Sequence, residues 1–395
     1  MRVAIATESF LPSLNGVTTS VCRVAECLRE QGHQAVIIAP GPAPATFAGH
    51  PVRTLPGFPV RGFRAGLPTR ELRRTLRSFR PDVVHLASPF LVGSGGASRA
   101  DELGLPTVAI YQTDMPSYVR QHGSGVLGRG ASSVTWEWIR RLHSRVDLTL
   151  APSRPTLADL RAHRIPRTDL WGRGVDTRLF HPSWREDPDT AALRRELAPG
   201  GEVLLGYVGR LAPEKELHRL AELAHLPGTR LVIVGEGPSR NEIGARLADA
   251  VARRLGRPNR PPVFLGSRTG TDLARAFAAL DVFVHTGTRE TFGQTLQEAA
   301  ATGLPVVAPA VGGPVDLVGH GSTGFLFDPE APGDLHRHVR ELVASPSLRA
   351  TMGAAGREAI RDRSWSSLTE QLVRHYERVV TTPAGISPAA YTLQR

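Results

Sequence analysis

The sequence predicts an α/β protein made of two doubly wound domains in tandem. Its 395 residues exceed the roughly 250 to 300 residues that one hydrophobic core usually serves, so two domains are expected. Two series of short apolar runs, rich in β-branched residues, alternate along the chain with helical or glycine-rich stretches. Because these runs show no alternation of polar and apolar residues, they indicate parallel strands that are buried on both faces.

The first series defines an N-terminal domain over residues 1–180. Its predicted strands are 3–6, 35–39, 83–86, 107–111 and 148–151. The second series defines a domain over residues 202–363, with predicted strands at 204–208, 231–234, 263–265, 282–285, 306–308 and 325–327. Open parallel sheets bind ligands outside the carboxyl ends of their strands. We therefore expect the chemistry in the loops after the strands, in a cleft between the two domains.

Three further segments complete the predicted organisation. Residues 181–201 contain three prolines and are expected to be a linker. Residues 364–380 carry apolar side chains on one stripe, which predicts an amphipathic helix. Residues 381–395 have two prolines and little periodicity, which predicts a loose tail.

Composition and charge exclude several classes of protein. The chain is 41% hydrophobic and 22% charged, which is ordinary for a globular protein. It has only two cysteines, no stretch near the roughly 20 apolar residues of a membrane span, and no signal-peptide core, so we expect a cytoplasmic protein. Residues 1–180 carry 23 Arg against 13 acidic residues, which is +10 of the total net charge of +11. This excess follows no nucleic-acid-binding motif and lacks interleaved aromatic residues, so nucleic acid is not an expected partner.

The strongest motif follows the fourth predicted strand of the second domain. If a helix opens near Gly293, the free N–H groups of Thr295 and Leu296 form a seat for phosphate at its positive end. Glu290 precedes this helix, and Glu298 lies one to two turns inside it. Carboxylates in these places can accept hydrogen bonds from the hydroxyls of two sugars, one at each end of a diphosphate.

A second motif follows the first predicted strand of the same domain. Gly209 and Arg210 lead to Pro213, which predicts a helix start, and Lys215 lies in the first turn. Because arginine is a planar fork and lysine a compact point charge, one of each is suited to hold a diphosphate from two sides. Lys215 is the only lysine among the 48 basic residues, which favours a specific role over a solvated surface position.

A third loop, residues 8–17, follows the first predicted strand of the chain. Asn15 and Gly16 either place backbone N–H groups at the cleft or form a structural turn. The glycine-rich fingerprint of nicotinamide-dinucleotide sites and the P-loop are both absent from the sequence. No histidine or cysteine spacing predicts a metal site, and the single D-x-D, at 187–189, lies in the predicted linker.

Taken together, these motifs resemble the retaining glycosyltransferases of family 4, which have the GT-B fold of two Rossmann-like domains. The resemblance covers the chain from Arg2 to about Val380. It implies that the helix at 364–380 crosses back to the N-terminal domain, that Glu290 contacts the donor hexose, and that Glu298 contacts the nucleotide ribose. The other donor contacts that it implies are Arg210 and Lys215 at the diphosphate, Arg268 near the base, and Gly16, Gly209, Phe292, Gly293, Gln294, Thr295 and Leu296.

Within the family, the strings at 111–114, 171–176 and 209–215 are most similar to the actinobacterial GDP-mannose-dependent α-mannosyltransferases. This implies retaining transfer of mannose to a glycolipid or polyprenol-type acceptor, with no metal and no cofactor other than the donor. The catalytic residues implied are Glu290, Arg210, Lys215 and Asp114, and those implied on the acceptor side are Gln112, Thr113 and Tyr118. Many members carry histidine where Gln112 stands, and glutamine cannot titrate, which argues against an acid–base role there.

Two alternatives stay open: a UDP-sugar-dependent transferase with a soluble acceptor, and a nucleotide-sugar epimerase on the same fold. The acceptor question also concerns residues 69–79, which predict a helix with a broad arginine face. Either this face docks the domain on anionic headgroups at the inner face of the plasma membrane, or the helix is solvated and its apolar stripe packs on the sheet. The cations in and around this helix, over residues 61–80, are Arg61, Arg64, Arg70, Arg73, Arg74, Arg77 and Arg80.

Overall fold

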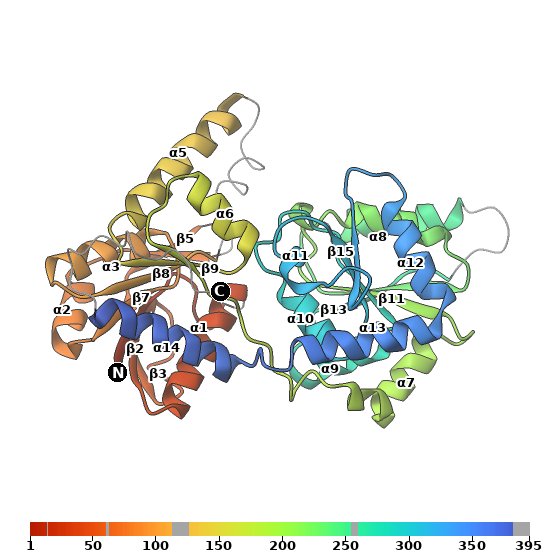
Figure 1. Ribbon diagram of the computed structural model, residues 1–395, viewed down its shortest axis with the longest axis horizontal. Coiled ribbons are helices and arrows are strands. Elements are labelled where there is room, and N and C mark those ends of the chain that lie inside the picture. Colours follow the sequence, from red (N-terminus) through yellow and green to blue (C-terminus); the bar gives the residue numbers. More distant parts are fainter. Residues whose placement is uncertain (14, 61–62, 113–125, 254–259, 382–395) are drawn as a thin grey trace. The chain divides into compact units, whose positions relative to one another are not determined.

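The computed structural model describes residues 1–13, 15–60, 63–112, 126–253 and 260–381, which fall into two compact units (Figure 1). Unit 1 comprises Met1–Arg173 and Trp365–Arg395, and unit 2 comprises Gly174–Ser364. Each unit contains a mainly parallel sheet with helices on both faces, which confirms the predicted fold class of two doubly wound α/β domains.

The main sheet of unit 1 has the strand order β10-β9-β8-β7-β1-β2-β4-β3. Adjacent strands are parallel except β3 and β4 at one edge. A separate antiparallel hairpin consists of β5 (Gly57–Val60) and β6 (Phe63–Gly66). The strands of the main sheet are β1 (Arg2–Ala6), β2 (Gln34–Pro40), β3 (Thr46–Phe47), β4 (His50–Leu55), β7 (Val83–Leu86), β8 (Thr107–Ile110), β9 (Leu148–Ala151) and β10 (Thr168–Leu170).

The helices of unit 1 pack on this sheet by their apolar faces. The first of them starts at a clear cap, because the side-chain oxygen of Asn15 accepts hydrogen bonds from the N–H groups of Val17 and Thr18, each at 3.0 Å. The helices are α1 (Gly16–Glu30), α2 (Arg70–Phe79), α3 (Leu91–Glu102), α5 (Val126–His143), α6 (Arg154–Ala162) and α14 (Trp365–Thr381).

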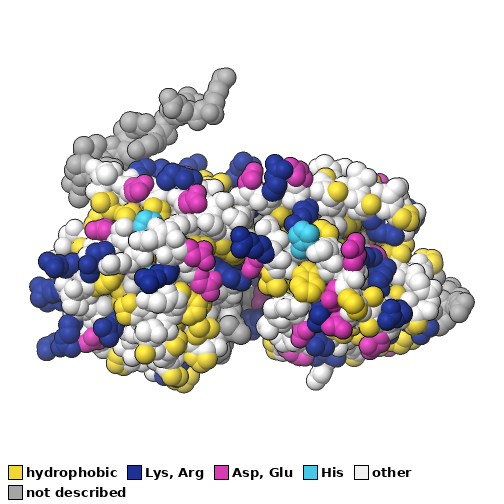
Figure 2. Space-filling model, turned by 90° about the horizontal axis from the view of Figure 1, so that it is seen from below, with side chains coloured by type: hydrophobic (Ala, Val, Ile, Leu, Met, Phe, Trp, Pro, Cys, Tyr) yellow, Lys and Arg dark blue, Asp and Glu magenta, His cyan; other side chains and the backbone are white. Residues whose placement is uncertain are grey.

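Helix α2 separates its apolar and basic side chains. Leu72 and Leu76 are 0% and 1% exposed and belong to a core cluster beneath the sheet. The arginines of the helix point to solvent and form part of the group of basic side chains at the left edge of Figure 2. The apolar stripe of this helix is therefore used within unit 1, as one of the two predicted interpretations requires.

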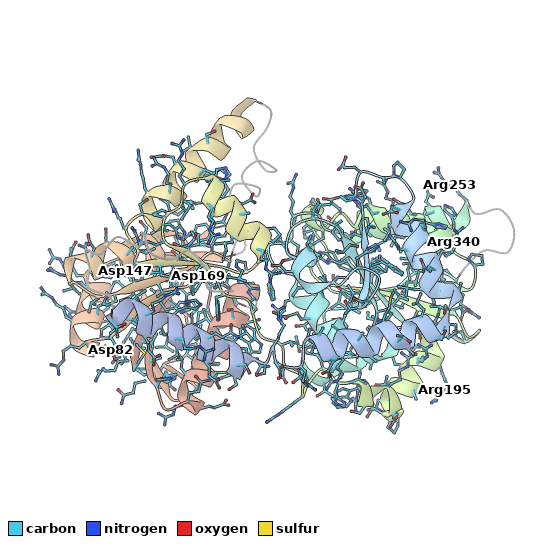
Figure 3. All side chains as sticks on the ribbon, in the orientation of Figure 1. Asp82, Asp147, Asp169, Arg195, Arg253 and Arg340 are labelled. Atoms are coloured by element: carbon cyan, nitrogen blue, oxygen red, sulfur yellow. The ribbon has the colours of Figure 1, made fainter. Side chains whose placement is uncertain are left out.

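Helix α14 is the predicted C-terminal helix, and it returns to unit 1 and packs on α1. Its Leu368 and Leu372 lie in the same core cluster as the apolar face of α1. The hydroxyl of Tyr376 and Nδ1 of the buried His85 form a hydrogen bond of 2.5 Å. Near the end of the helix, Arg378 forms an ion pair of 2.7 Å with Asp169, which is labelled in Figure 3. Of the predicted tail, only Thr381 lies within the described residues, where it ends α14.

The sheet of unit 2 has the strand order β13-β12-β11-β14-β15-β16, and all its pairs are parallel. The strand order reverses direction between β11 and β14, which is the position where ligands bind in doubly wound sheets. The strands are β11 (Val203–Val208), β12 (Thr229–Val234), β13 (Val263–Gly266), β14 (Val282–Val284), β15 (Val306–Pro309) and β16 (Gly324–Phe327). The helices after β11 are η2 (Pro213–Lys215), η3 (Leu217–His225), α8 (Arg240–Ala252), α9 (Gly270–Ala279), α10 (Gln294–Ala301), α11 (Pro314–Leu317), α12 (Asp334–Ala344) and α13 (Pro346–Ala359).

The prediction that residues 181–201 form a linker is wrong. They form η1 (Pro182–Glu186) and α7 (Pro188–Leu197), and they belong to unit 2. Two of the three prolines stand at the first position of a helix, where proline is favourable because its missing N–H group has no helical partner anyway. Arg185 and Arg194 also bind the carboxylate of Asp281, at 2.6 and 2.9 Å, which fixes these helices to the body of the unit.

In the parts of the chain that the structure describes, no helix is both long enough and apolar enough to cross a membrane.

Candidate functional site

Unit 2 brings the two strongest predicted motifs together at the carboxyl ends of β11 and β14. The hydroxyl of Thr286, in the loop after β14, donates a hydrogen bond of 2.7 Å to the backbone oxygen of Lys215, in the loop after β11. The hydroxyl of Thr288 donates to the carboxylate of Glu216. Because β11 and β14 are neighbours in the sheet, loops that are about 75 residues apart in the chain form one surface.

The centre of this surface is an ion pair between Lys215 and Glu290. Lys215 Nζ lies 2.6 Å from Glu290 Oε2, and the two side chains are 23% and 18% exposed. Burial alone would lower the pKa of the Lys215 ammonium, but attraction to the Glu290 carboxylate outweighs it and holds that pKa above its usual value. The backbone of Glu290 is fixed as well, because its oxygen accepts a hydrogen bond of 2.7 Å from the N–H of Gly313. A ligand at this edge therefore meets a fixed cation and a fixed carboxylate side by side.

A layer of two buried rings supports this pair. His285 is 2% exposed, its Nε2 lies 3.8 Å from Glu290 Oε2, and its ring is stacked on that of Tyr207, with the centroids 6.4 Å apart. Burial lowers the pKa of His285 to about 4, so the imidazole is neutral at pH 7. The Tyr207 hydroxyl donates a hydrogen bond of 3.0 Å to the oxygen of Arg210 and so holds the loop after β11. From the sequence, Tyr207 and His285 were predicted only as parts of the strands 204–208 and 282–285. The sign of a further role is that each is a polar residue at or near the end of an apolar run.

The predicted phosphate seat falls at the start of helix α10. Gly293 precedes the helix with φ of 104°, a left-handed conformation that glycine adopts without strain. The N–H of Leu296 is not free as predicted, because it donates a hydrogen bond of 3.0 Å to the Gly293 oxygen. Among the described residues, the N–H groups of Gln294 and Thr295 have no hydrogen-bond partner. Two donors at the positive end of the helix therefore remain for an anion.

Other residues predicted to bind the donor lie on the same edge of the sheet and differ in their exposure to solvent. Phe292 is buried, whereas Glu298 is half-buried, four residues after Gln294 in α10. The Arg210 side chain is 62% exposed, with Nη1 3.4 Å from Glu214. Arg268 is exposed and follows β13, two strands away from β11. The predicted helix after Pro213 is only the short 3₁₀ turn η2, which the left-handed Glu216 ends.

Two glycine-containing loops of this surface, after β12 and after β15, were not predicted from the sequence. After β12, Gly235 has φ of 133°, and a Cβ there would lie 1.9 Å from the oxygen of Gly209. After β15, a Cβ on Gly313 would lie 2.3 Å from the oxygen of Phe292. Only glycine permits these close approaches, and the signal in the sequence was glycine soon after an apolar run, at Gly235 and at the pair Gly312 and Gly313.

In unit 1, the predicted residues Gly16 and Gln112 are joined by an arginine that the prediction did not single out. Arg173 Nη2 donates a hydrogen bond of 2.6 Å to Gln112 Oε1. A Cβ on Gly16 would lie 3.1 Å from Arg173 Nη1, so the guanidinium covers the start of α1. The remaining predicted residues of this unit, Thr113, Asp114 and Tyr118, lie outside the described residues.

Comparison with known proteins identifies the family. A model described as Glycosyltransferase Family 4 matches residues 14–179, and one described as Glycosyl transferases group 1 matches residues 189–359. The chain is 45% identical, over 390 residues, to the GDP-mannose-dependent alpha-mannosyltransferase of Mycolicibacterium smegmatis, covering 96% of this chain and 98% of that protein. The chain belongs to glycosyltransferase family 4. The protein of the same name from Corynebacterium glutamicum is 38% identical and covers 96% of this glycosyltransferase and 89% of its own length.

Solved structures agree with the fold of this glycosyltransferase. The Anabaena protein HepE in complex with UDP has a TM-score of 0.77 at 21% identity and covers 96% of this chain and all of its own. WaaG, a glycosyltransferase involved in lipopolysaccharide biosynthesis, has a TM-score of 0.69 at 18% identity, again over 96% of this chain and all of its own. Identities this low support the shared fold alone.

Within the described ranges, no group of three or more His, Cys, Asp or Glu is placed to hold a metal ion. The D-x-D motif forms a helix start: Asp187 caps α7 through the N–H of Thr190 at 3.0 Å and pairs with Arg275 at 3.0 Å.

Proposed function

We propose that this glycosyltransferase transfers mannose from GDP-mannose to a hydroxyl acceptor and retains the anomeric configuration. The observation that carries the proposal is the 45% identity, over 96% of the chain, to a relative named as a GDP-mannose-dependent alpha-mannosyltransferase. The paired Lys215 and Glu290 at the switch point of unit 2 support it, because a nucleotide sugar offers a diphosphate to the cation and hydroxyls to the carboxylate.

In this proposal the donor lies along the carboxyl edge of the unit 2 sheet. Lys215 and Arg210 bind the diphosphate, and the unpaired N–H groups at the start of α10 bind its oxygens, with backbone contacts from Gly209, Phe292, Gly293 and Leu296. Glu290 holds hydroxyls of the mannose, Glu298 holds the ribose, and Arg268 lies near the base. Gly16 and Gln112 of unit 1, with Thr113, Asp114 and Tyr118, serve the transferring sugar and the acceptor.

The chemistry needs stabilisation of a leaving group more than it needs a base. The bond between C1 of mannose and the diphosphate oxygen breaks, the acceptor oxygen bonds to C1 from the same side, and the departing phosphate takes the acceptor proton. Negative charge grows on the diphosphate during this step, so a preorganised ammonium beside it lowers the barrier. Glu290 pairs with Lys215 before donor binding, which keeps the lysine charged and fixed in place.

The acceptor is proposed to be a lipid presented at an anionic membrane surface. Arg70, Arg73, Arg74 and Arg77 are exposed on α2, while the buried Leu72 leaves no apolar stripe for insertion, so the proposed docking is electrostatic. Each cation near such a surface contributes about 1 kcal/mol. Replacing the four arginines by Gln is expected to abolish sedimentation with anionic liposomes at low salt and to leave GDP binding unchanged. Undiminished sedimentation of the variant, or none of the wild type, would favour a soluble acceptor.

The transfer reaction itself is tested with GDP-mannose and a membrane extract as the source of acceptor. The proposal predicts release of GDP only when acceptor is present, and an α-mannoside in the product by NMR. Conversion of the nucleotide sugar to an isomer without acceptor would show an epimerase instead. Turnover of UDP-sugars in preference to GDP-mannose would favour the other alternative.

A further inference from the structure

Unit 2 contains a cavity of about 500 Å³ that is separate from the proposed donor site. Gly303 lines it and stands between the end of α10 and the start of β15. The donor residues lie instead at the carboxyl ends of the parallel strands. The cavity is therefore at the opposite edge of the sheet, and its volume falls within the range of small-molecule sites.

One wall of the cavity is a face of α13. Ala350, Ala354, Arg357 and Arg361 follow one another at intervals of four, three and four residues, which places them on one side of the helix and its end. The two alanines are small and exposed, so they leave space beside the arginines. Thr177, Pro182 and the buried Ile360 also line the cavity.

Arg357 is the feature that points to an anion. Its Nη1 donates hydrogen bonds to the backbone oxygens of Phe180, at 3.2 Å, and of Ala301, which anchor the guanidinium in place. In the described part of the chain no carboxylate pairs with Arg357, although the side chain is half-buried. Burial lowers the pKa of this guanidinium, and burial together with the Arg357 charge lowers the pKa of the adjacent His181. A half-buried charge without a counter-ion is unfavourable unless an anion joins it.

The rim supplies a second cation. The Arg361 side chain is 69% exposed, and its Nη1 lies 2.9 Å from Glu358, which also lines the cavity. Arg361 Nε also lies 3.9 Å from Asp362, and Arg361 lines the same cavity as Arg357, just after the end of α13. Pro182, Ala354 and Ile360 are apolar side chains of the lining, and Thr177 and Glu358 are its other polar side chains.

We propose that this cavity binds a small organic anion, whose phosphate or carboxylate is held by Arg357 and Arg361 and whose apolar body lies against Pro182, Ala354 and Ile360. Guanidinium groups bind phosphates and carboxylates through paired N–H donors. The cavity is too large for an inorganic ion alone, and the apolar wall favours a ligand with a hydrocarbon part.

The test is calorimetric titration of hexyl phosphate into the full chain saturated with GDP, so that the diphosphate site is occupied. We expect saturable binding that weakens at least tenfold in Ala354→Phe, which fills the cavity without altering a charge, and in Arg361→Gln. The matched control is Arg340→Gln, on the exposed face of α12 (Figure 3), which should bind as the wild type does. These variants spare Arg357, whose loss would also remove the bonds to Phe180 and Ala301.

Several results would overturn the proposal: no saturable binding to the wild type, unchanged affinity in Ala354→Phe, or equal affinity for hexanol, which lacks the charge. If inorganic phosphate binds as tightly as hexyl phosphate, the apolar residues of the cavity do not contribute to binding. Each variant is first shown to bind GDP like the wild type. If the wild type does not bind GDP, the proposed donor site is wrong, and the titration with hexyl phosphate still tests this cavity.

Discussion

Glu8 is expected to make the stability of unit 1 depend on pH. Its side chain, at the end of β1, is 3% exposed, and its carboxyl group accepts hydrogen bonds from the Ser88 hydroxyl and the Val92 N–H at the start of α3. Burial has the larger effect and raises the pKa of this carboxyl from 4.5 to about 7.

The direction of the change in stability with pH follows from how tightly the folded and unfolded chains bind the Glu8 proton. The folded unit holds the Glu8 proton more tightly than the unfolded chain, so the stability linked to Glu8 is fully present below pH 4.5 and is lost as the pH rises to about 7. At 1.36 kcal/mol per pKa unit, the full effect is about 3 kcal/mol, of which about 2 kcal/mol falls between pH 5 and pH 8. Glu8→Gln keeps the shape of the side chain but does not titrate. The variant should therefore gain about 2 kcal/mol on the wild type over this interval.

Hydrogen exchange of peptides from β1 and α3 measures this difference within unit 1, because each pH compares wild type and variant under the same intrinsic exchange rate. Glu370→Gln, on the exposed side of α14, is the matched control and should show no pH-dependent difference. If the difference in opening free energy between Glu8→Gln and wild type is the same at pH 5 and pH 8, the ionisation of Glu8 does not control the stability of unit 1.

Three further predictions concern the site and the return helix. Glu298→Ala should weaken GDP binding, whereas Glu290→Ala should mainly lower kcat, each by about 1.5 to 3 kcal/mol; equal GDP affinity in wild type and Glu298→Ala would remove the ribose role. Lys215→Arg should lose most activity with an unchanged circular dichroism spectrum, because a planar fork replaces a compact ammonium beside Glu290, and full activity would make the single lysine accidental. Tyr376→Phe leaves the buried His85 Nδ1 without its partner and should destabilise α14 by about 1 to 3 kcal/mol in hydrogen exchange, and unchanged protection would contradict this.

The fold was predictable because both sheets are built from continuous apolar runs, which local sequence reveals. The pairing of Lys215 with Glu290 was less accessible. Each residue was identified from its own loop, but their contact depends on β11 lying next to β14, and strand order is set by the packing of whole elements. His285 and Tyr207 were missed for a related reason, since a ring in an apolar run gives no local sign that it supports a charged pair.

The incorrect prediction of a linker at residues 181–201 has a different cause. Pro182 and Pro188 were taken as breaks in structure, yet each begins a helix. The deciding contacts are those of Arg185 and Arg194 with Asp281, which is 96 and 87 residues away, and no local pattern shows them. The free N–H predicted for Leu296 failed in the same way, because the left-handed Gly293 turns its oxygen toward that group.

The proposed role of Lys215 and Glu290 is to hold the donor, a guanosine diphosphate sugar, at the carboxyl edge of the unit 2 sheet. Calorimetric titration of GDP and UDP into the wild type and Lys215→Gln tests it most directly. We predict that the wild type binds GDP more tightly than UDP, and that Lys215→Gln loses about 1.5 to 3 kcal/mol of GDP binding, which is roughly 10- to 150-fold in Kd. A preference for UDP would rule out a guanosine donor, and a GDP affinity that Lys215→Gln leaves unchanged would rule out Lys215 as a ligand of the diphosphate.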